Sequence, residues 1–530
     1  MLRHKKIKHF VHFVLLVFGL IVFQAAHAQL MTSAAIGATV RSQFSTGKIH
    51  INKIVLEEPH IIPKGSMKKF FAKYEGTEIS VQDLKEIQSR LSKYYYAKGY
   101  INSGIIVPNQ RISNGEIRFR AVHGRLTRVK TKGNERLSNS YVKNAVAKGV
   151  AVPLNSHQLQ RALESLQKHP LIDEVKAQVS PGENLGQSIL SLSIKEAKPY
   201  FFNTEVSNHQ SPGIGQYRLG INTGHRDVLG YRDTFNFQLG ISEGLVDGYA
   251  GYSIPLGVQD YLFNTYVNYG SYEIVEDDLD ITSKSTSYGF SFSTPLIAAS
   301  KLDLSAGIGL DVKHMTLNMF GSNTGDDVEG FDENGSNSTP LVLHLTALYQ
   351  QPKFVAAMYA GLRRGLAVNF YGDVSDQQVF TVGVGQLSIA VRPKQKIEWL
   401  LQINGQFTRD NLLPAERFAI GGAKTVRAYR ENLLVRDNGV VISNQVRFTV
   451  YRSNVFIVPF VDYGRSWDSE EGTFGVNGEQ IYSVGSGVQW KANKSIYTEL
   501  FWGKTLRDAD VPTKITQDYS LHFMLRYTIH

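Results

Sequence analysis

The sequence predicts an α+β region followed by an all-β membrane barrel of sixteen antiparallel strands. Residues 49–197 alternate helical and extended patterns in two similar stretches, whereas residues 198–530 consist mainly of short runs in which apolar and polar side chains alternate. The connections between these runs are alternately tight and long, which is typical of bacterial outer-membrane barrels. The 530 residues include no cysteine, which excludes disulfides, thiolate metal sites and a cysteine nucleophile.

Residues 1–28 have the pattern of a signal peptide for secretion. Basic residues precede an apolar run over residues 10–23, and Ala26-His27-Ala28 then forms a small-residue cleavage site. A membrane anchor is the alternative, but the apolar run is short for a bilayer, which needs about 20 residues. We expect residues 29–48 to be an N-terminal extension in which residues 31–44 form a short helix.

Charge is divided unevenly between the two parts of the chain. Residues 29–197 hold 25 Lys and Arg against 13 Asp and Glu, whereas residues 198–530 hold 28 against 34. This division indicates two different tasks. The basic part is either ordinary solvated surface or a surface that attracts an acidic partner. Nucleic acid is not an expected partner for a chain with a secretory signal.

Residues 49–124 are expected to form one small α/β unit. Ser80 is placed to cap a helix, with Asp83 three residues later in the position of a capping box. Apolar residues then recur at helical spacing until Gly99, which ends the helix. Strands are expected at residues 51–56, 101–108 and 116–122.

Residues 125–197 repeat this plan. Ser138 caps a helix that ends at Gly149, and Asn155 caps a second helix with an apolar face. Strands are expected at residues 126–131, 175–179 and 188–195.

The two units resemble polypeptide-transport-associated (POTRA) domains, which also have a β-α-α-β-β plan of about 75 residues. The resemblance places POTRA 1 at residues 49–124 and POTRA 2 at residues 125–197. It is carried in the first unit by a run of motif residues typical of two-partner secretion transporters: Gly99, Tyr100, Pro108, Gln110 and Gly115.

From residue 198 onward the alternation predicts transmembrane strands with one apolar and one polar face. An even number of strands returns both ends of the barrel to the periplasm. A soluble set of β-sandwiches is the alternative. The sixteen expected strands are residues 199–208, 216–224, 232–241, 247–255, 261–270, 283–293, 301–312, 340–351, 354–362, 378–390, 396–408, 439–452, 455–463, 481–490, 495–503 and 518–529.

By this segmentation the sixth outer loop, residues 409–438, carries a glycine-hinged motif with a central arginine. Gly421-Gly422 permits a sharp chain reversal, and Val426-Arg427-Ala428-Tyr429 follows. A polar loop with a cation suits a water-filled interior better than a lipid-facing surface. On the thirteenth expected strand, Phe460-Val461-Asp462-Tyr463-Gly464 places Asp462 on the inward face by alternation.

These two motifs resemble the sixth-loop and strand motifs of two-partner secretion transporters, the TpsB or ShlB-FhaC-HecB-like branch of the BamA-like outer-membrane superfamily. The resemblance implies that the sixth outer loop folds inward and that Arg427 pairs with Asp462 to latch it. An exposed arginine and an unrelated aspartate are the alternative. Ala428 stands where the family has glycine, so it would be strained if this position needs a positive φ.

The family resemblance implies an outer-membrane pore that recognises an unfolded exoprotein in the periplasm and secretes it without ATP (two-partner, or type Vb, secretion). The implied partners are a TpsA-like client bound by the POTRA domains, outer-membrane lipid and, during biogenesis, the barrel-insertion machinery and periplasmic chaperones. A barrel-assembly factor is the first alternative, although such proteins typically carry three to five POTRA units. A passive porin or receptor is the second.

Motifs for enzymatic chemistry are not found in the sequence. The histidines lack zinc-protease spacing, and neither a G-x-S-x-G lipase elbow nor a GxxxxGK[ST] phosphate loop occurs. The acidic stretch at residues 326–335 does not match an EF-hand, so a solvated outer loop is favoured over a Ca²⁺ site. We therefore expect no catalytic residues, no metal and no cofactor.

Overall fold

The computed structural model describes residues 36–257, 261–275, 281–299, 301–319, 336–368, 370, 379–451, 454–469, 478–507 and 515–529. The chain divides into two compact units, Met1–Ala197 and Lys198–His530. The expected signal peptide and the acidic stretch at residues 326–335 lie outside the described residues. In the described part of the chain, no helix is both long enough and apolar enough to cross a membrane.

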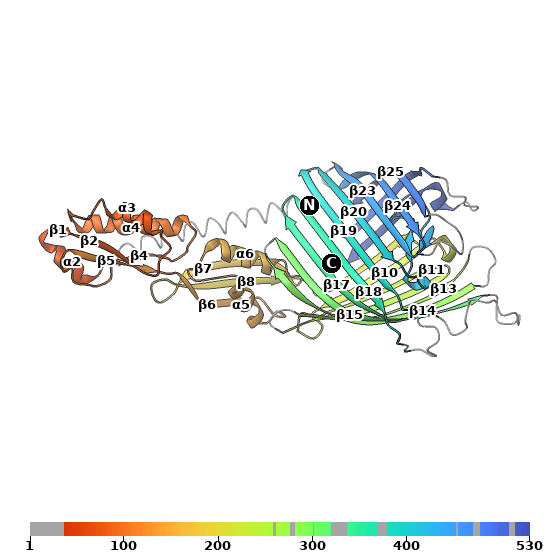
Figure 1. Cartoon of the computed structure of the whole chain (residues 1–530), viewed down its shortest axis with the longest axis horizontal. Helices are drawn as coiled ribbons and strands as arrows, with labels where there is room; N and C mark the ends of the chain where they lie inside the picture. Colours follow the sequence, from red (N-terminus) through yellow and green to blue (C-terminus); the bar gives the residue numbers. More distant parts are fainter. Residues whose placement is uncertain are drawn as a thin grey trace. The chain divides into compact units, whose positions relative to one another are not determined.

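The first half of the N-terminal unit is a three-stranded sheet covered by helices (Figure 1). In this sheet β5 lies in the centre, parallel to β2 and antiparallel to β4, while β1 and β3 form a separate pair. Its elements are α2 (Ala38–Gln43), η1 (Phe44–Thr46), β1 (Ile49–Ile51), β2 (Lys53–Glu57), α3 (Lys64–Phe71), β3 (Thr77–Ile79), α4 (Val81–Ala97), β4 (Gly104–Ile106) and β5 (Glu116–Val122).

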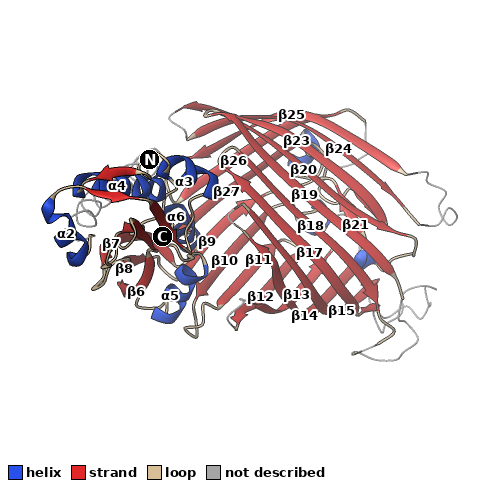
Figure 2. Cartoon of the chain, turned by 60° about the vertical axis from the view of Figure 1, so that its left-hand side comes forward, coloured by secondary structure: helices blue, strands red, loops and turns tan. Residues whose placement is uncertain are grey.

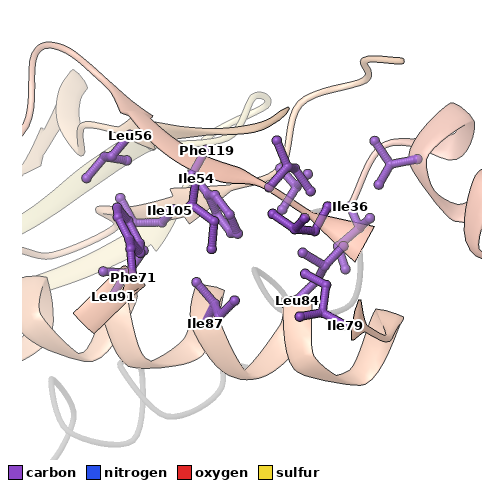
Figure 3. Packing of buried hydrophobic residues seen from close by; sticks show 14 of the residues in the cluster. Ile36, Ile54, Leu56, Phe71, Ile79, Leu84, Ile87, Leu91, Ile105 and Phe119 are labelled. Carbon is purple, nitrogen blue, oxygen red and sulfur yellow. The ribbon is translucent and has the colours of Figure 1, made fainter. Parts of the chain in front are cut away.

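Helix α4 begins and ends as its sequence predicts. The Ser80 hydroxyl accepts a hydrogen bond from the Asp83 amide, and the Asp83 carboxylate accepts one from the Ser80 amide at 2.8 Å. Gly99, just beyond the helix, has a φ of +81°. Figure 3 shows the apolar face of α4, with Ile87 and Leu84, turned toward the sheet side chains that complete this core.

The second half of the N-terminal unit has the same strand order. Its strand β8 lies between a parallel partner, β6, and an antiparallel partner, β7. Ser138 and Asn155 accept hydrogen bonds from the first turns of α5 and α6, which confirms both predicted caps. Its elements are β6 (Arg125–Lys132), α5 (Asn139–Lys148), α6 (Ser156–Gln167), β7 (Ile172–Pro181) and β8 (Gln187–Glu196).

Several motif residues of the first domain shape its backbone. The Gln110 side chain acts as an additional strand segment: its Nε2 donates to the Arg118 carbonyl at 2.6 Å and its Oε1 accepts from the Arg118 amide at 2.9 Å. Gly115 has a φ of +67°, and a Cβ there would lie 2.8 Å from the Asn52 amide nitrogen. Pro108 follows Val107, whose carbonyl accepts a hydrogen bond from Gly37 at 3.0 Å.

The turn between α4 and β4 joins the two domains. Ile101 belongs to the apolar core of the second domain, although it is flanked by first-domain residues. Asn102 has a φ of +56°, and its Nδ2 donates to the Gln187 carbonyl at 2.8 Å and to the Ser188 hydroxyl at 2.9 Å. The strand expected at residues 101–108 is therefore shorter, because its first three residues turn into the neighbouring domain.

Asn102→Ala is expected to loosen this junction. Alanine tolerates a positive φ poorly, and the variant also loses two side-chain hydrogen bonds, so we expect a local destabilisation of about 2 kcal/mol. Hydrogen exchange of the full-length protein would show faster exchange at residues 99–103 and 187–188. Asn114→Ala is the matched control, because Asn114 has a φ of +55° but lies exposed in a turn. Equal effects of both changes would contradict a junction role.

The second unit is a closed barrel, which confirms the predicted sixteen antiparallel strands (Figure 2). Strand β27 pairs with β9 to close it. The short β16 (Ser336–Ser338) precedes β17 and pairs with the same neighbour, β15. The strands are β9 (Tyr200–Ser207), β10 (Arg218–Arg226), β11 (Thr234–Ser242), β12 (Leu245–Leu256), β13 (Tyr261–Glu273), β14 (Ile281–Ala298), β15 (Leu302–Met319), β17 (Pro340–Gln351), β18 (Phe354–Gly365), β19 (Thr381–Lys394), β20 (Ile397–Thr408), β23 (Asn438–Tyr451), β24 (Val455–Trp467), β25 (Glu479–Lys491), β26 (Ile496–Thr505) and β27 (Leu521–Ile529).

The barrel strands have two different faces. On β24, Ile457 and Val461 are exposed, whereas Phe460 and Asp462 are buried. Because side chains alternate along a strand, the exposed apolar residues form the outer surface and the buried ones face the interior. Closure gives each of the sixteen barrel strands a pairing partner on both sides within the described residues, as a lipid environment requires.

Candidate functional site

The connection between β20 and β23 is the sixth outer loop, and it lies against the inner face of the barrel. It contains η4 (Pro414–Glu416) and a hairpin of β21 (Phe418–Ile420) and β22 (Leu434–Arg436), which the sequence did not predict. Ile420 and Val426 of the loop form an apolar cluster with Val441 of β23 and Ile481 of β25. The loop thus has its own small core against the barrel wall.

Two glycines turn the chain at the start of the loop tip. Gly421 and Gly422 have φ values of +116° and +101°, backbone conformations that residues other than glycine rarely adopt. A Cβ on Gly422 would lie 2.0 Å from the Glu431 carboxyl carbon. The backbone conformation therefore requires glycine at both positions, and a Cβ on Gly422 would displace the Glu431 carboxyl group.

The structure places Arg427 directly against Asp462 of β24. Arg427 Nε lies 2.7 Å from Asp462 Oδ2, and Arg427 Nη2 lies 2.8 Å from Asp462 Oδ1, so the two side chains form a bidentate ion pair. The Arg427 guanidinium also donates to Ser443 at 3.0 Å and to Gln445 at 2.6 Å, both on β23. The arginine is 4% exposed and the aspartate 0%. Such a pair stabilises the loop only because its remaining donors and acceptors are also satisfied.

Aromatic rings cover the arginine. Its guanidinium carbon lies 3.8 Å from the centre of the Phe460 ring and 5.1 Å from that of Phe501 on β26. The two rings meet edge to face at 5.9 Å. A cation over the face of an aromatic ring is attracted to it, and the attraction grows when water is excluded. Phe460 belongs to the predicted strand motif, whereas Phe501 was not identified from the sequence.

Glycines of the wall make room for the loop tip. A Cβ on Gly464 would lie 2.7 Å from side-chain atoms of both Ile420 and Val426. On the neighbouring strands, Gly485 and Gly503 lie opposite one another, and a Cβ on either would crowd the Phe460 ring. Only Gly464 was singled out from the sequence; glycines at inward positions of adjacent strands are the signal that could have revealed the other two.

Ala428 adopts the conformation for which the family glycine is suited. Its φ is +75°, and its side chain is 3% exposed. A left-handed backbone costs a non-glycine residue roughly 1–2 kcal/mol because Cβ approaches the following carbonyl. The loop tip therefore carries backbone strain next to its main ion pair.

Further contacts tie the loop tip to the eighth outer loop, where the sequence had indicated nothing. The Tyr429 hydroxyl lies within hydrogen-bond distance of the Tyr482 and Arg507 carbonyls, at 3.1 and 2.8 Å. Arg430 binds Asp518 with two contacts, of 2.6 and 2.9 Å. Asp518 lies in η5 (Thr516–Tyr519), just before β27. Charges in irregular loops have no periodicity, so no sequence pattern could pair them.

Glu431 is a buried carboxyl group at the same tip. It accepts a hydrogen bond from the Ala423 amide at 2.7 Å, and its own amide donates to Gln517 at 3.0 Å. Burial raises the pKa of Glu431 to about 7, against the opposing influence of the Ala423 amide and Lys424. Within the described ranges, no group of three or more His, Asp or Glu side chains is arranged to hold a metal ion.

Comparison with known families identifies two matches. Residues 186–490 match the haemolysin secretion/activation proteins ShlB/FhaC/HecB, and residues 49–124 match the ShlB-type POTRA domain. The heme/hemopexin transporter protein HuxB of Haemophilus influenzae is 22% identical over 78% of this chain and 76% of its own. The outer membrane transporter CdiB-2 of Burkholderia pseudomallei is 23% identical over 79% and 76%.

Solved structures share the fold at low sequence identity. CdiB from Escherichia coli is 17% identical, with a TM-score of 0.66 over 96% of this chain and 98% of its own. BamA from Haemophilus ducreyi, lacking POTRA domains 1–3, is 13% identical, with a TM-score of 0.56 over 91% and 100%. At these identities the likeness concerns the architecture of the chain.

Ala428→Gly is expected to hold the loop tip more firmly. Relief of the left-handed strain contributes about 1 kcal/mol, which lowers the released fraction of the loop about fivefold. Because the chain lacks cysteine, Val426→Cys introduces a single buried thiol whose reaction with a maleimide reports release. The rate should fall when Ala428→Gly is added. A faster reaction would show that the buried methyl group matters more than the strain.

Loop packing is expected to weaken as the pH rises from about 4.5 to 7. Because the pKa of Glu431 is raised in the packed loop, the packed state binds the proton more tightly than the released one. The stabilising contribution is complete below pH 4.5 and is lost as the pH rises through about 7. Thiol reactivity at Val426→Cys, taken relative to the same protein with Glu431→Gln, should increase over this range. A constant ratio would contradict the proposed titration.

Proposed function

The chain belongs to the haemolysin secretion/activation family ShlB/FhaC/HecB, and on this basis we propose that it exports an unfolded protein across the bacterial outer membrane. The relatives are named as transporters, and the barrel lies in the outer membrane with its POTRA domains in the periplasm. One observation carries the proposal for this chain: the sixth loop packs inside the barrel through the buried Arg427–Asp462 pair. A barrel that holds its own loop in its interior can regulate passage by moving that loop.

The client is proposed to bind first to the POTRA domains as an added β-strand. In the second domain, β6 and β7 each pair only with β8 among the described strands, so one edge of each is available. An extended polypeptide can add to such an edge through main-chain hydrogen bonds, with little demand on its side chains. The exposed side chains of β6 include Arg125, Arg128, Lys130 and Lys132, which favours a client segment rich in Asp and Glu.

The Arg427–Asp462 pair is proposed to hold the loop in the position from which export begins. Removal of either partner leaves the other charge buried and unpaired, which is strongly unfavourable in a site that excludes water. The loop would then leave the wall, whereas the strand pairing of the barrel does not depend on this contact. The client would thread through the barrel in an extended form and fold outside, so that its folding prevents return.

Deletion of the gene for this chain is expected to remove one or a few large proteins from the culture medium. Complementation with the unaltered gene should restore them, whereas Arg427→Ala or Asp462→Ala should reduce secretion at least about tenfold, since each leaves an unpaired buried charge. Mass spectrometry of the medium measures secretion, and heat modifiability on gels reports whether the barrel is inserted. Arg392→Ala, which removes an exposed arginine that pairs with Glu398 of the wall, is the control and should secrete normally.

Two results would contradict these proposals. An unchanged set of secreted proteins, together with a general loss of outer-membrane barrels, would identify an assembly factor instead. Normal secretion by both latch variants would leave the export function standing and remove the role of the ion pair.

A further inference from the structure

The base of the sixth loop is held to the barrel wall by a second buried charge, Glu416. This residue ends the short helix η4, and its side chain is 1% exposed. Its Oε1 lies 2.7 Å from Lys313 Nζ and accepts a hydrogen bond from the Ser338 hydroxyl at 3.0 Å. Its Oε2 lies 3.4 Å from Arg363 Nη1. One carboxylate of the loop thus pairs with two cations of the wall.

The partners of Glu416 come from β15, β16 and β18, strands other than those that hold the loop tip. The polarity is also reversed: at the tip the loop supplies the cation and the wall the carboxylate, whereas at the base the loop supplies the carboxylate. The Gln406 side chain fixes this turn further by donating to the Glu416 carbonyl at 2.8 Å. The loop is therefore bound to the wall at two places, by a positive side chain at its tip and by a negative side chain at its base.

The wall side of this contact has the chemistry of a carboxylate-binding site. Lys313 and Arg363 keep 20% and 29% of their side chains exposed, so they are accessible from the interior once the loop withdraws. Arg363 Nε is buried without a hydrogen-bond partner among the described residues, so the guanidinium has an unused donor. The nearby carboxylate of Asp311 already accepts a hydrogen bond from the Tyr266 hydroxyl at 2.9 Å.

We propose that Lys313, Ser338 and Arg363 form a carboxylate seat on the channel wall, which Glu416 occupies at rest and acidic side chains of the exported chain occupy when the loop withdraws. An acidic segment competes with Glu416 for the same two cations and so favours the displaced loop. The inference takes the export channel proposed above as its premise and adds the chemistry that the channel recognises. The seat is positively charged, as is strand β6, which also favours an acidic client.

Single-channel recording of the full-length protein in planar lipid bilayers tests the seat. Glu416→Gln keeps the shape of the side chain and removes its charge, so the time spent in the conducting state should increase about tenfold. Removal of this one negative charge beside Lys313 and Arg363 should also shift the ion selectivity toward chloride. An unstructured Asp/Glu-rich peptide should block this variant several times more strongly than its Asn/Gln counterpart, and Lys313→Gln should remove that difference.

Glu398→Gln is the matched control. Glu398 also accepts from two arginines, Arg392 at 2.6 Å and Arg447 at 2.9 Å, but all three residues belong to the barrel wall. It should shift selectivity without a change in open time. Wild-type open times in Glu416→Gln, or equal block by the acidic and neutral peptides, would overturn the proposal. These recordings require no client, so such a result would leave the export function untouched.

Discussion

The burial of Arg427 beside Asp462 is the constraint on which the interior of this barrel depends. A charge pair removed from water is tolerated only when every donor and acceptor is satisfied and the fit is close. Ser443 and Gln445 supply the missing acceptors, and Phe460 covers the cation. The requirement for a close fit extends to the wall, where glycines replace side chains beneath the loop tip.

The loop that carries this arginine is attached at its base as well, through Glu416, and at its tip to the eighth loop, through Arg430 and Asp518. These charged contacts are joined by the apolar cluster that packs the loop against β23 and β25, whereas the barrel itself is held by continuous strand pairing. In the proposed mechanism the loop leaves the wall without loss of the barrel, because the loop contacts and the strand pairing are different interactions. The strained backbone of Ala428 and the titratable Glu431 both lie in this loop.

Much of the site was accessible from the sequence, because motif and alternation act together. The double glycine and the inward direction of Asp462 follow from a turn signal and from the period of two in a strand, whereas the pairing of Arg427 with Asp462 was implied by the family resemblance. Arg430, Glu416 and the glycines of β25 and β26 could not be found in this way. These residues are far in the sequence from the residues they contact. A charged residue in a loop also gives no indication of which strand it will contact.

The sixteen strands, their order along the chain and the caps of α4, α5 and α6 could be predicted from sequence patterns alone, because alternation, turns and capping are local properties. Three features became known only from the complete fold: the contacts of the loop, the positive φ of Ala428, and the place of Ile101 and Asn102 in a domain junction rather than in a strand. These features depend on which surfaces come into contact after the barrel closes and after the two POTRA domains pack against each other. Local sequence patterns carry no information about contacts between residues that are far apart in the sequence, because only the complete fold brings these residues together.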